Sequence, residues 1–248
     1  MTSVEKEYYI HYYEINFRKE LMITSIMNFF QDIFVYTIES NGKGIDYLKT
    51  INSTWMVYRW EIDIYKYPTY NQKVKVKMTP TGYRKSYMNI MFEIFSEEGE
   101  KIVEALSLWV IIDTKRNLPC KNVLENAYEV YGLSSNNTNI ITMRKIGLPQ
   151  NINNEEVFKV GYGDIDTNGH VNNVKYLNWL LESLAEDIVK EYKLSKIEIS
   201  YKKDAKYNEI IKSSAETITE KTAVRCVHKI TDGQNGILVI AETFWENI

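Results

Sequence analysis

The sequence contains few of the residues that cross-link a chain or bind metal ions. Among its 248 residues are 2 Cys and 3 His. Cys120 and Cys226 fit neither CxxC nor CxxxC spacing, so a disulfide framework is disfavoured and reduced, cytoplasmic thiols are predicted. Three His without a Cys cluster predict no transition-metal site. We therefore expect neither a metal nor a cofactor.

Long apolar runs and an excess of one charge are also missing. The first ten residues lack the apolar core of a signal peptide, and runs such as residues 108–112 are too short to cross a bilayer. The 30 Lys and Arg nearly balance the 33 Asp and Glu, for a net charge of −3, so nucleic acid is not an expected partner. With 44% apolar and 25% charged residues, the composition is that of a globular protein.

Two stretches carry apolar residues at helical spacing, and each is followed by strand-like runs. The first stripe runs from Ile23 to Ile38, and the second from Val174 to Ile188. No strands and helices alternate in the βαβ manner, so the pattern predicts an α+β fold with antiparallel sheets. The strand-like runs are residues 55–65, 72–79, 85–96 and 102–113, then 197–201, 213–219, 224–231 and 237–245.

The two halves resemble each other residue by residue. A shift of 150 places Tyr12 on Tyr162 and Asn28 on Asn178, and a shift of 136 places Trp109 on Trp245. Together with matches at a shift of 137, these pairs predict a duplicated unit of roughly 110–130 residues. We expect an N-terminal module over residues 1–131, an Asn- and Ser-rich linker over 132–155 and a C-terminal module over 156–248.

A polar cluster distinguishes the second half. Asp166, Asn168 and His170 alternate along one segment, so their side chains share one side if that segment is extended. A helix is predicted to begin directly after them, with Asn172 or Asn173 as its N-cap. Free N–H groups at a helix start favour negative charge, so the cluster suits stabilisation of an oxyanion.

The first half does not repeat this cluster. The matching positions hold Asn16, Arg18 and Glu20, and Tyr67 matches Asp204. The duplication therefore predicts one working site, in the second half.

Two other interpretations of the cluster remain. Residues 164–169 fit the first six positions of an EF-hand calcium loop. Position 12 of that loop would be Lys175, a cation where a bidentate Glu is required, so calcium is disfavoured. The other alternative is a capped turn with a structural role only.

The cluster belongs to a longer string that resembles a known family. Residues 164–176, DIDTNGHVNNVKY, followed by Trp179 and Glu182-Ser183, resemble the signature of acyl-ACP thioesterases of the plant FatA/FatB type and their bacterial relatives. Residues 13–15, 55–59, 66–69 and 108–110 resemble the N-terminal module of that family. The resemblance implies two tandem hotdog modules, each a long helix wrapped by an antiparallel sheet.

The family hydrolyses the thioester between a fatty acyl chain and acyl carrier protein. The resemblance implies that Asp166, Asn168 and His170 are site residues. It places the acidic residue of the family 34 positions beyond the His, which is Asp204 here. Asp204 stands where the family usually has Glu, and Ala205 stands where many members have Cys. The second difference argues against a cysteine nucleophile.

The chemistry of these residues favours direct attack by water. The chain has no GxSxG elbow for a serine acyl-enzyme. Asp204 is expected to take the proton of the water or to orient it, with attack by Asp204 itself as the alternative. Asn168 and His170 would hold the water or the thioester, and Asp166 would fix the Asn168 amide or the loop. The N–H groups near Asn172, Asn173 and Val174 would polarise the carbonyl.

The remaining expectations concern the acyl chain and the partners. The resemblance implies that the N-terminal module, including Phe30 and Trp55, shapes the acyl-chain pocket. The partner is acylated acyl carrier protein, without nucleic acid or a membrane span, and a homodimer is allowed. Lysines 73, 75 and 77, or 202, 203 and 206, would steer this acidic partner. The alternatives are an acyl-CoA thioesterase on the same fold and a non-catalytic acyl-binding protein.

Overall fold

The chain folds into two compact units. The computed structural model describes residues 3–120, 139–220 and 223–248. Unit 1 comprises Met1–Tyr58 and Ile64–Met143, and unit 2 comprises Arg59–Asp63 and Arg144–Ile248. The predicted linker over 132–155 lies outside the described residues up to position 138.

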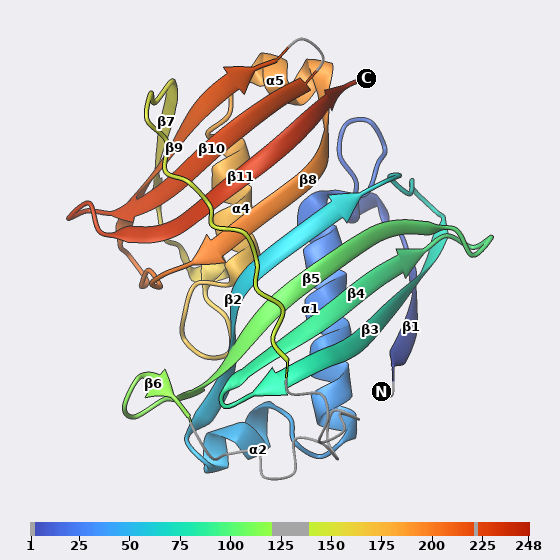
Figure 1. Ribbon diagram of the computed structural model, residues 1–248, viewed down its shortest axis with the longest axis vertical. Helices are drawn as coiled ribbons and strands as arrows, with labels where there is room; N and C mark the ends of the chain where they lie inside the picture. The colour runs from blue at the N-terminus through green and yellow to red at the C-terminus, as the bar shows by residue number, and fades with distance from the viewer. Residues whose placement is uncertain (1–2, 121–138, 221–222) are drawn as a thin grey trace. The chain divides into compact units, whose positions relative to one another are not determined.

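Unit 1 is a long helix against an antiparallel sheet (Figure 1). The strand order is β1-β3-β4-β5-β2, with the short β6 paired to β5. The strand pleat buries every second residue of β3 up to Pro80, as expected for a sheet with one face on a core. The elements are β1 Val4–Tyr9, the 3₁₀ turn η1 Tyr12–Glu14, α1 Ile23–Ser40, α2 Ile45–Thr50, β2 Ser53–Ile64, β3 Lys73–Arg84, β4 Tyr87–Phe95, β5 Lys101–Asp113 and β6 Leu118–Pro119.

Unit 2 repeats this plan. Its strand order, read from the N-terminal edge strand, is β7-β9-β10-β11-β8, which matches β1-β3-β4-β5-β2 strand for strand. Residues Arg59–Asp63 of β2, which are grouped with unit 2, pair antiparallel with β8. The elements are β7 Asn154–Lys159, the 3₁₀ turn η2 Tyr162–Asp164, α4 Asn173–Glu182, α5 Glu186–Glu191, β8 Tyr192–Tyr201, β9 Ile210–Thr219, β10 Ala223–Asp232 and β11 Ile237–Asn247.

The duplication predicted from the sequence is confirmed in the details of the turns. In unit 1 the N–H of Asn16 donates to the carbonyl of Glu20 at 2.8 Å, and in unit 2 the N–H of Asp166 donates to the carbonyl of His170 at 2.8 Å. Lys19 and Gly169, also 150 positions apart, both have positive φ, of 64° and 77°. Each unit is therefore an α+β hotdog module, and the two stand in tandem.

The core of each unit lies between the helix and the sheet. In unit 1 the α1 residue Phe30 is fully buried and packs on Phe92 of β4, with ring centroids 4.9 Å apart. In unit 2 the α4 residues Leu177 and Leu180 are fully buried. The predicted helical stripes thus face the sheets, as an apolar face must.

The second helix differs from the predicted stripe. The stripe from Val174 to Ile188 is divided, because α4 ends at Glu182 and α5 begins at Glu186. At the break, the Ser183 hydroxyl donates to the carbonyl of Leu180 at 2.8 Å and lies 3.0 Å from the hydroxyl of Ser213 on β9. Serine side chains that compete for backbone partners in this way disfavour continuation of a helix.

Part of the predicted linker is held by the sheet of unit 2. The buried carboxylate of Glu242 accepts bonds from Arg144 at 2.9 Å and from the N–H of Gly147 at 3.1 Å. Glu216 accepts the N–H of Gln150 at 2.6 Å. The strand β7 begins at Asn154, two residues before the predicted start of the C-terminal module.

Candidate functional site

The predicted cluster forms a tight turn built around Asp166, and not the extended segment in which alternating side chains would share one side. One oxygen of Asp166 accepts the backbone N–H of Asn168 at 2.8 Å and that of His170 at 3.3 Å. A carboxylate that binds N–H groups two and four positions ahead closes the turn by itself. The positive φ of Gly169 suits the residue without a Cβ. Asp166 therefore shapes the loop, and Asn168 lies exposed at its surface.

The helix α4 begins directly after this turn. The side chain of Asn172 accepts the N–H of Val174 at 2.9 Å, which makes Asn172 the N-cap. The N–H of Asn172 itself donates to the carbonyl of Asp164 at 2.8 Å. These two N–H groups are engaged within the protein, so the geometry does not support the expectation that they polarise a substrate carbonyl. Asn173 is the first residue of α4, and its carbonyl accepts the hydroxyl of Tyr201 at 3.1 Å.

His170 and Asp204 meet although 34 residues separate them in the sequence. The Nδ1 of His170 is hydrogen-bonded to the Oδ2 of Asp204. The side chains are 43% and 25% exposed, so the pair is open to solvent on one side. Asp204 follows β8, and His170 precedes α4. The fold thus brings together a carboxylate and an imidazole at the surface of unit 2.

The pair determines the charge state of its members. The hydrogen bond to Asp204 raises the pKa of His170 against the opposing effect of burial. The hydrogen bond from His170 lowers the pKa of Asp204. The geometry therefore favours an imidazolium bound to a carboxylate more than solvent does for the separate side chains. The Nε2 of this imidazolium carries a second N–H, which is a donor for an oxygen atom that gains negative charge.

Hydrogen bonds hold the chain both before and after Asp204. The N–H groups of Lys202 and Lys203 donate to the carbonyl of Leu238 at 2.7 and 3.2 Å. The N–H of Ala205 donates to the hydroxyl of Tyr176 at 2.6 Å. Sequence reasoning misses Tyr176 as a site residue, because its contact with Ala205 joins positions 29 residues apart.

The matching region of unit 1 is built from the same turn with other side chains. Asn16 accepts the N–H groups of Arg18 and Glu20 at 2.9 and 3.1 Å, as Asp166 does in unit 2. Burial, and then the negative charge of Glu20, raise the pKa of Tyr67, which stands at the position of Asp204. Unit 1 thus has no imidazole opposite a carboxylate at these positions.

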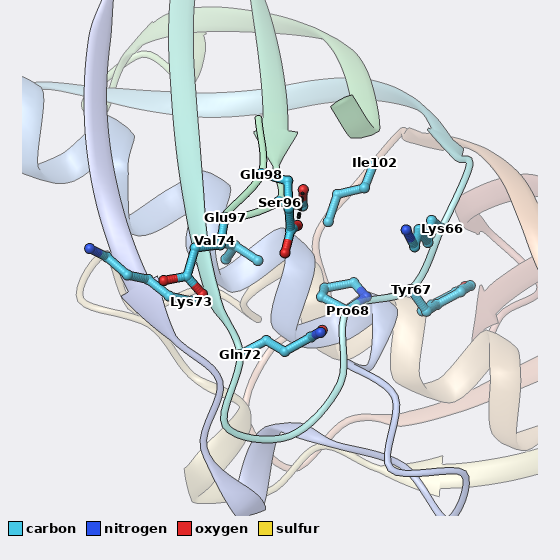
Figure 2. A pocket seen from close by; sticks show the side chains of 10 residues that line it. All are labelled: Lys66, Tyr67, Pro68, Gln72, Lys73, Val74, Ser96, Glu97, Glu98 and Ile102. Atoms are coloured by element: carbon cyan, nitrogen blue, oxygen red, sulfur yellow. Dashed lines mark hydrogen bonds between the residues drawn. The ribbon is translucent and has the colours of Figure 1, made fainter. Parts of the chain in front are cut away.

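A surface pocket of unit 1 lies beside Tyr67 (Figure 2). Its lining is mostly polar and charged, and a hydrogen bond of 2.7 Å joins Ser96 to Glu98. None of its lining side chains is a histidine, so the pocket offers no second copy of the His170–Asp204 pair. The lining residues are Lys66, Tyr67, Pro68, Gln72, Lys73, Val74, Ser96, Glu97, Glu98 and Ile102.

The predicted acyl contacts lie in the core of unit 1. Phe30 is fully buried, and Trp55 is 6% exposed. Trp55 meets Phe34 edge to face, with ring centroids 6.2 Å apart, and Phe34 stacks on Trp109 at 4.1 Å.

Residues 3–120, 139–220 and 223–248 contain no group of three or more His, Cys, Asp or Glu that could hold a metal ion. Among the same residues, no helix has the length and apolar character needed to cross a membrane. The ammonium of Lys175 lies 3.4 Å from the carboxylate of Asp164, where an EF-hand loop would carry its Glu.

Comparison with known proteins agrees with the geometry. The patterns of the acyl-ACP thioesterase N-terminal and C-terminal domains match residues 2–131 and 149–247. The oleoyl-acyl carrier protein thioesterase 2 of Arabidopsis thaliana is 26% identical over 94% of this chain and 67% of its own length. The palmitoyl-acyl carrier protein thioesterase of Gossypium hirsutum is 25% identical over 95% of this chain and 62% of its own length. The chain thus spans about two thirds of the length of these relatives, whose names describe them as chloroplastic.

Solved structures show the same fold. The 12:0-ACP thioesterase from Umbellularia californica superposes with a TM-score of 0.84 at 18% identity, over 99% of this chain and 94% of the other. An acyl-ACP thioesterase from Bacteroides thetaiotaomicron superposes with a TM-score of 0.84 at 17% identity, over 98% of both chains. With both halves of the chain matched by the two domain patterns, this protein belongs to the acyl-ACP thioesterase family.

Proposed function

We propose that the protein hydrolyses the thioester of acylated acyl carrier protein and releases a free fatty acid. The observation that carries the proposal is the His170–Asp204 pair, in a chain of this family. The pair supplies both an acceptor for the proton of a water molecule and a donor for the thioester oxygen.

In the proposed reaction, Asp204 orients and deprotonates the attacking water. Its lowered pKa keeps the carboxylate ionised at neutral pH. The water oxygen bonds to the thioester carbon while its proton moves to Asp204, and the carbonyl oxygen becomes an oxyanion. Collapse of this intermediate breaks the C–S bond. The departing thiolate then takes the proton that Asp204 received, so that the products are the fatty acid and the carrier thiol and Asp204 is ionised again.

His170 stabilises the oxyanion and holds Asp204 in place. Its raised pKa favours the protonated ring, in which Nδ1–H stays on Asp204 and Nε2–H faces the substrate. An aimed donor of this kind contributes about 10²–10³ in kcat. Asp166 acts through the turn that it closes, and Asn168 contacts the water or the thioester.

Asp204 and His170 have an alternative division of labour. A neutral His170 with its proton on Nδ1 would leave Nε2 free as the base, and Asp204 would only orient the ring. The raised pKa of His170 disfavours this arrangement, because it favours the protonated imidazole, which cannot accept a proton.

The acidic carrier is proposed to dock near Asp204. Lys202 and Lys206 are exposed on the segment that carries Asp204. Such charges accelerate the encounter with an acidic partner and lose their effect at high salt. The ammonium of Lys203 lies 3.0 Å from the carboxylate of Asp232, so its charge is largely neutralised.

The lysines along β3 are engaged elsewhere. Their ammonium groups lie 2.7 to 3.6 Å from carboxylates of the neighbouring strands, so their charge is largely neutralised. The pairs are Lys73–Glu7, Lys75–Glu5 and Lys77–Glu93.

The acyl chain is proposed to lie in unit 1, with Phe30 and Trp55 as contacts. Because both side chains are buried, a chain that reaches them must displace core packing. Phe30→Ala would remove the ring and is expected to shift the preference toward longer chains, at a cost of about 3–5 kcal/mol in the free energy of unfolding.

Two experiments test the proposed function. Steady-state hydrolysis of a panel of acyl-ACPs with C8 to C18 chains, beside acyl-CoAs of the same lengths, is expected to show higher kcat/KM for the carrier substrates. Faster turnover of acyl-CoA would identify a CoA thioesterase, and binding without turnover would identify an acyl-binding protein.

The second experiment removes the site. His170→Ala and Asn168→Ala should each lower kcat by about 10²-fold or more, with folding checked by circular dichroism. Near-wild-type rates in both variants would remove the proposed site.

A further inference from the structure

The residue after Asp204 is hydrogen-bonded to a buried tyrosine of another element. The N–H of Ala205, the residue after Asp204, donates to the Tyr176 hydroxyl at 2.6 Å. Ala205 is fully buried and Tyr176 is 3% exposed. Because water does not reach this N–H, the Tyr176 hydroxyl is the group that satisfies it, and an unsatisfied buried N–H is costly.

Tyr176 joins the two segments that form the site. It is the fourth residue of α4, the helix that follows the His170 turn without an intervening loop. The ring of Tyr176 is fixed by edge-to-face contact with Trp179, with centroids 5.4 Å apart. The bond to Ala205 therefore ties the segment of Asp204 to the same helix that carries the His170 turn.

The duplication supplies a natural comparison. At the matching positions unit 1 has Ile26, which has no hydroxyl, and Pro68, which has no N–H. Both partners of the bond are thus replaced in the unit that has no counterpart of the His170–Asp204 pair at the matching positions. There the carbonyl of Pro68 instead accepts the N–H of Leu21 at 2.9 Å. The tyrosine tether accompanies the site, and the module without the site is held by a backbone bond.

We propose that Tyr176 is a positioning residue for the hydrolysis: its hydroxyl holds the Ala205 N–H so that the neighbouring carboxylate meets the imidazole of His170. This inference rests on the proposed function for its effect on rate, and on geometry alone for its effect on the pair. Catalytic groups must be held closely, since a displacement of about 1 Å can cost about 10²-fold in rate.

The test removes the bond from each side in the full-length protein. Tyr176→Phe deletes the hydroxyl, and Ala205→Pro deletes the N–H by a change that unit 1 carries at the matching position. Tyr8→Phe is the matched control, because the Tyr8 hydroxyl bonds to Asp32 at 2.6 Å in unit 1. The measurements are kcat and KM for an acyl-ACP from pH 5 to 9, and the pKa of His170 by NMR titration of its ring.

The proposal expects a specific pattern. Tyr176→Phe should lower kcat by about 10-fold to 100-fold with KM within about threefold, and should lower the pKa of His170 toward its ordinary value. Tyr8→Phe should leave both quantities unchanged. Because a single bond is removed from two sides, the double variant Tyr176→Phe/Ala205→Pro should be no slower than the slower single variant.

Other outcomes would overturn the proposal. One is an unchanged pKa of His170 and an unchanged pH profile in Tyr176→Phe, even if the variant melts earlier. Another is a double variant whose losses multiply. If Ala205→Pro does not fold, Tyr176→Phe against Tyr8→Phe decides alone. If the wild-type protein does not hydrolyse acyl-ACP, the proposed function fails, whereas the NMR titration still decides whether Tyr176 positions the pair.

Discussion

Replacement of Asp204 by Asn separates the chemistry of the site from its stability. Asn keeps the size of the side chain but cannot take a proton from water. Loss of a general base costs about 10²–10⁴ in kcat, which corresponds to about 2.7–5.5 kcal/mol in the activation free energy. We expect Asp204→Asn to lie in this range. Asp204→Glu restores the side chain usual in the family and should retain activity, reduced about tenfold by its altered reach.

The expected loss of stability is much smaller. The His170 and Asp204 side chains are 43% and 25% exposed, so solvent screens their interaction. Half-exposed ion pairs of this kind contribute about 1 kcal/mol or less to the free energy of unfolding. For a chain of this size, a loss of about 1 kcal/mol lowers Tm by about 2–4 °C. A large fall in kcat with a nearly unchanged Tm would therefore locate the effect in the reaction.

The pH dependence gives the same assignment an independent check. The pKa of Asp204 is lowered. The ionised carboxylate that the reaction needs is therefore fully present above the ordinary Asp pKa and is lost as pH falls through the lowered pKa. The pKa of His170 is raised. The imidazolium that stabilises the oxyanion is therefore fully present below the ordinary His pKa and is lost as pH rises through the raised pKa. Both groups are in their active form between the lowered pKa of Asp204 and the raised pKa of His170, and we expect a bell-shaped kcat/KM profile.

Steady-state hydrolysis of acyl-ACP by the wild type and the Asn and Glu variants measures these effects, with circular dichroism as the check on folding. In Asp204→Asn the alkaline limb should move to lower pH, because His170 loses its anionic partner. If the Asn variant is as fast as wild type, Asp204 is not the base. If the wild-type rate instead rises as His170 loses its proton and then stays constant, neutral His170 is the base.

Three further predictions concern other parts of the chain. Arg18→Ala and Glu20→Ala, which alter the turn of unit 1, should leave kcat within a few-fold; a loss equal to that of His170→Ala would contradict a single site. Asn172→Ala removes the N-cap bond of α4 and should cost about 1 kcal/mol in urea unfolding, whereas an unchanged midpoint would contradict the cap. Burial lowers the pKa of His228 to about 3, so the unfolded chain binds a proton first as pH falls. Stability should therefore decline below about pH 6.5, by up to about 1.36 kcal/mol per pH unit. His228→Gln should reduce this slope in calorimetry, and an equal slope would refute the assignment.

Much of the fold follows from local pattern. The apolar stripe of residues 23–38 and the alternation along the strands predict a helix on an antiparallel sheet, and the structure confirms both. The turn from Asp166 to His170 is equally local, because one carboxylate closes it through N–H groups two and four positions ahead. The same turn with Asn16 in unit 1 shows that the duplicated sequence determines it twice.

The end of the second helix and the path of the segment after residue 143 could not be predicted from the apolar pattern alone. The apolar residues from Val174 to Ile188 keep helical spacing throughout, yet the helix ends at Glu182. The next residue, Ser183, is hydrogen-bonded to Ser213 of a strand that comes later in the chain. The segment after residue 143 has no period of its own. It is held because Glu216 and Glu242 present carboxylates to its N–H groups and to Arg144.

The candidate site separates what the sequence determines from what the tertiary structure determines. The sequence by itself placed Asp166, Asn168 and His170 together directly before a helix. It predicted an extended segment for them, and the structure has a turn that the Asp166 carboxylate closes. Only the tertiary structure placed Asp204 against His170 and the Tyr176 hydroxyl on the N–H of Ala205. These contacts join positions 34 and 29 residues apart, and their geometry depends on how β8 and α4 pack, which no spacing along the chain encodes.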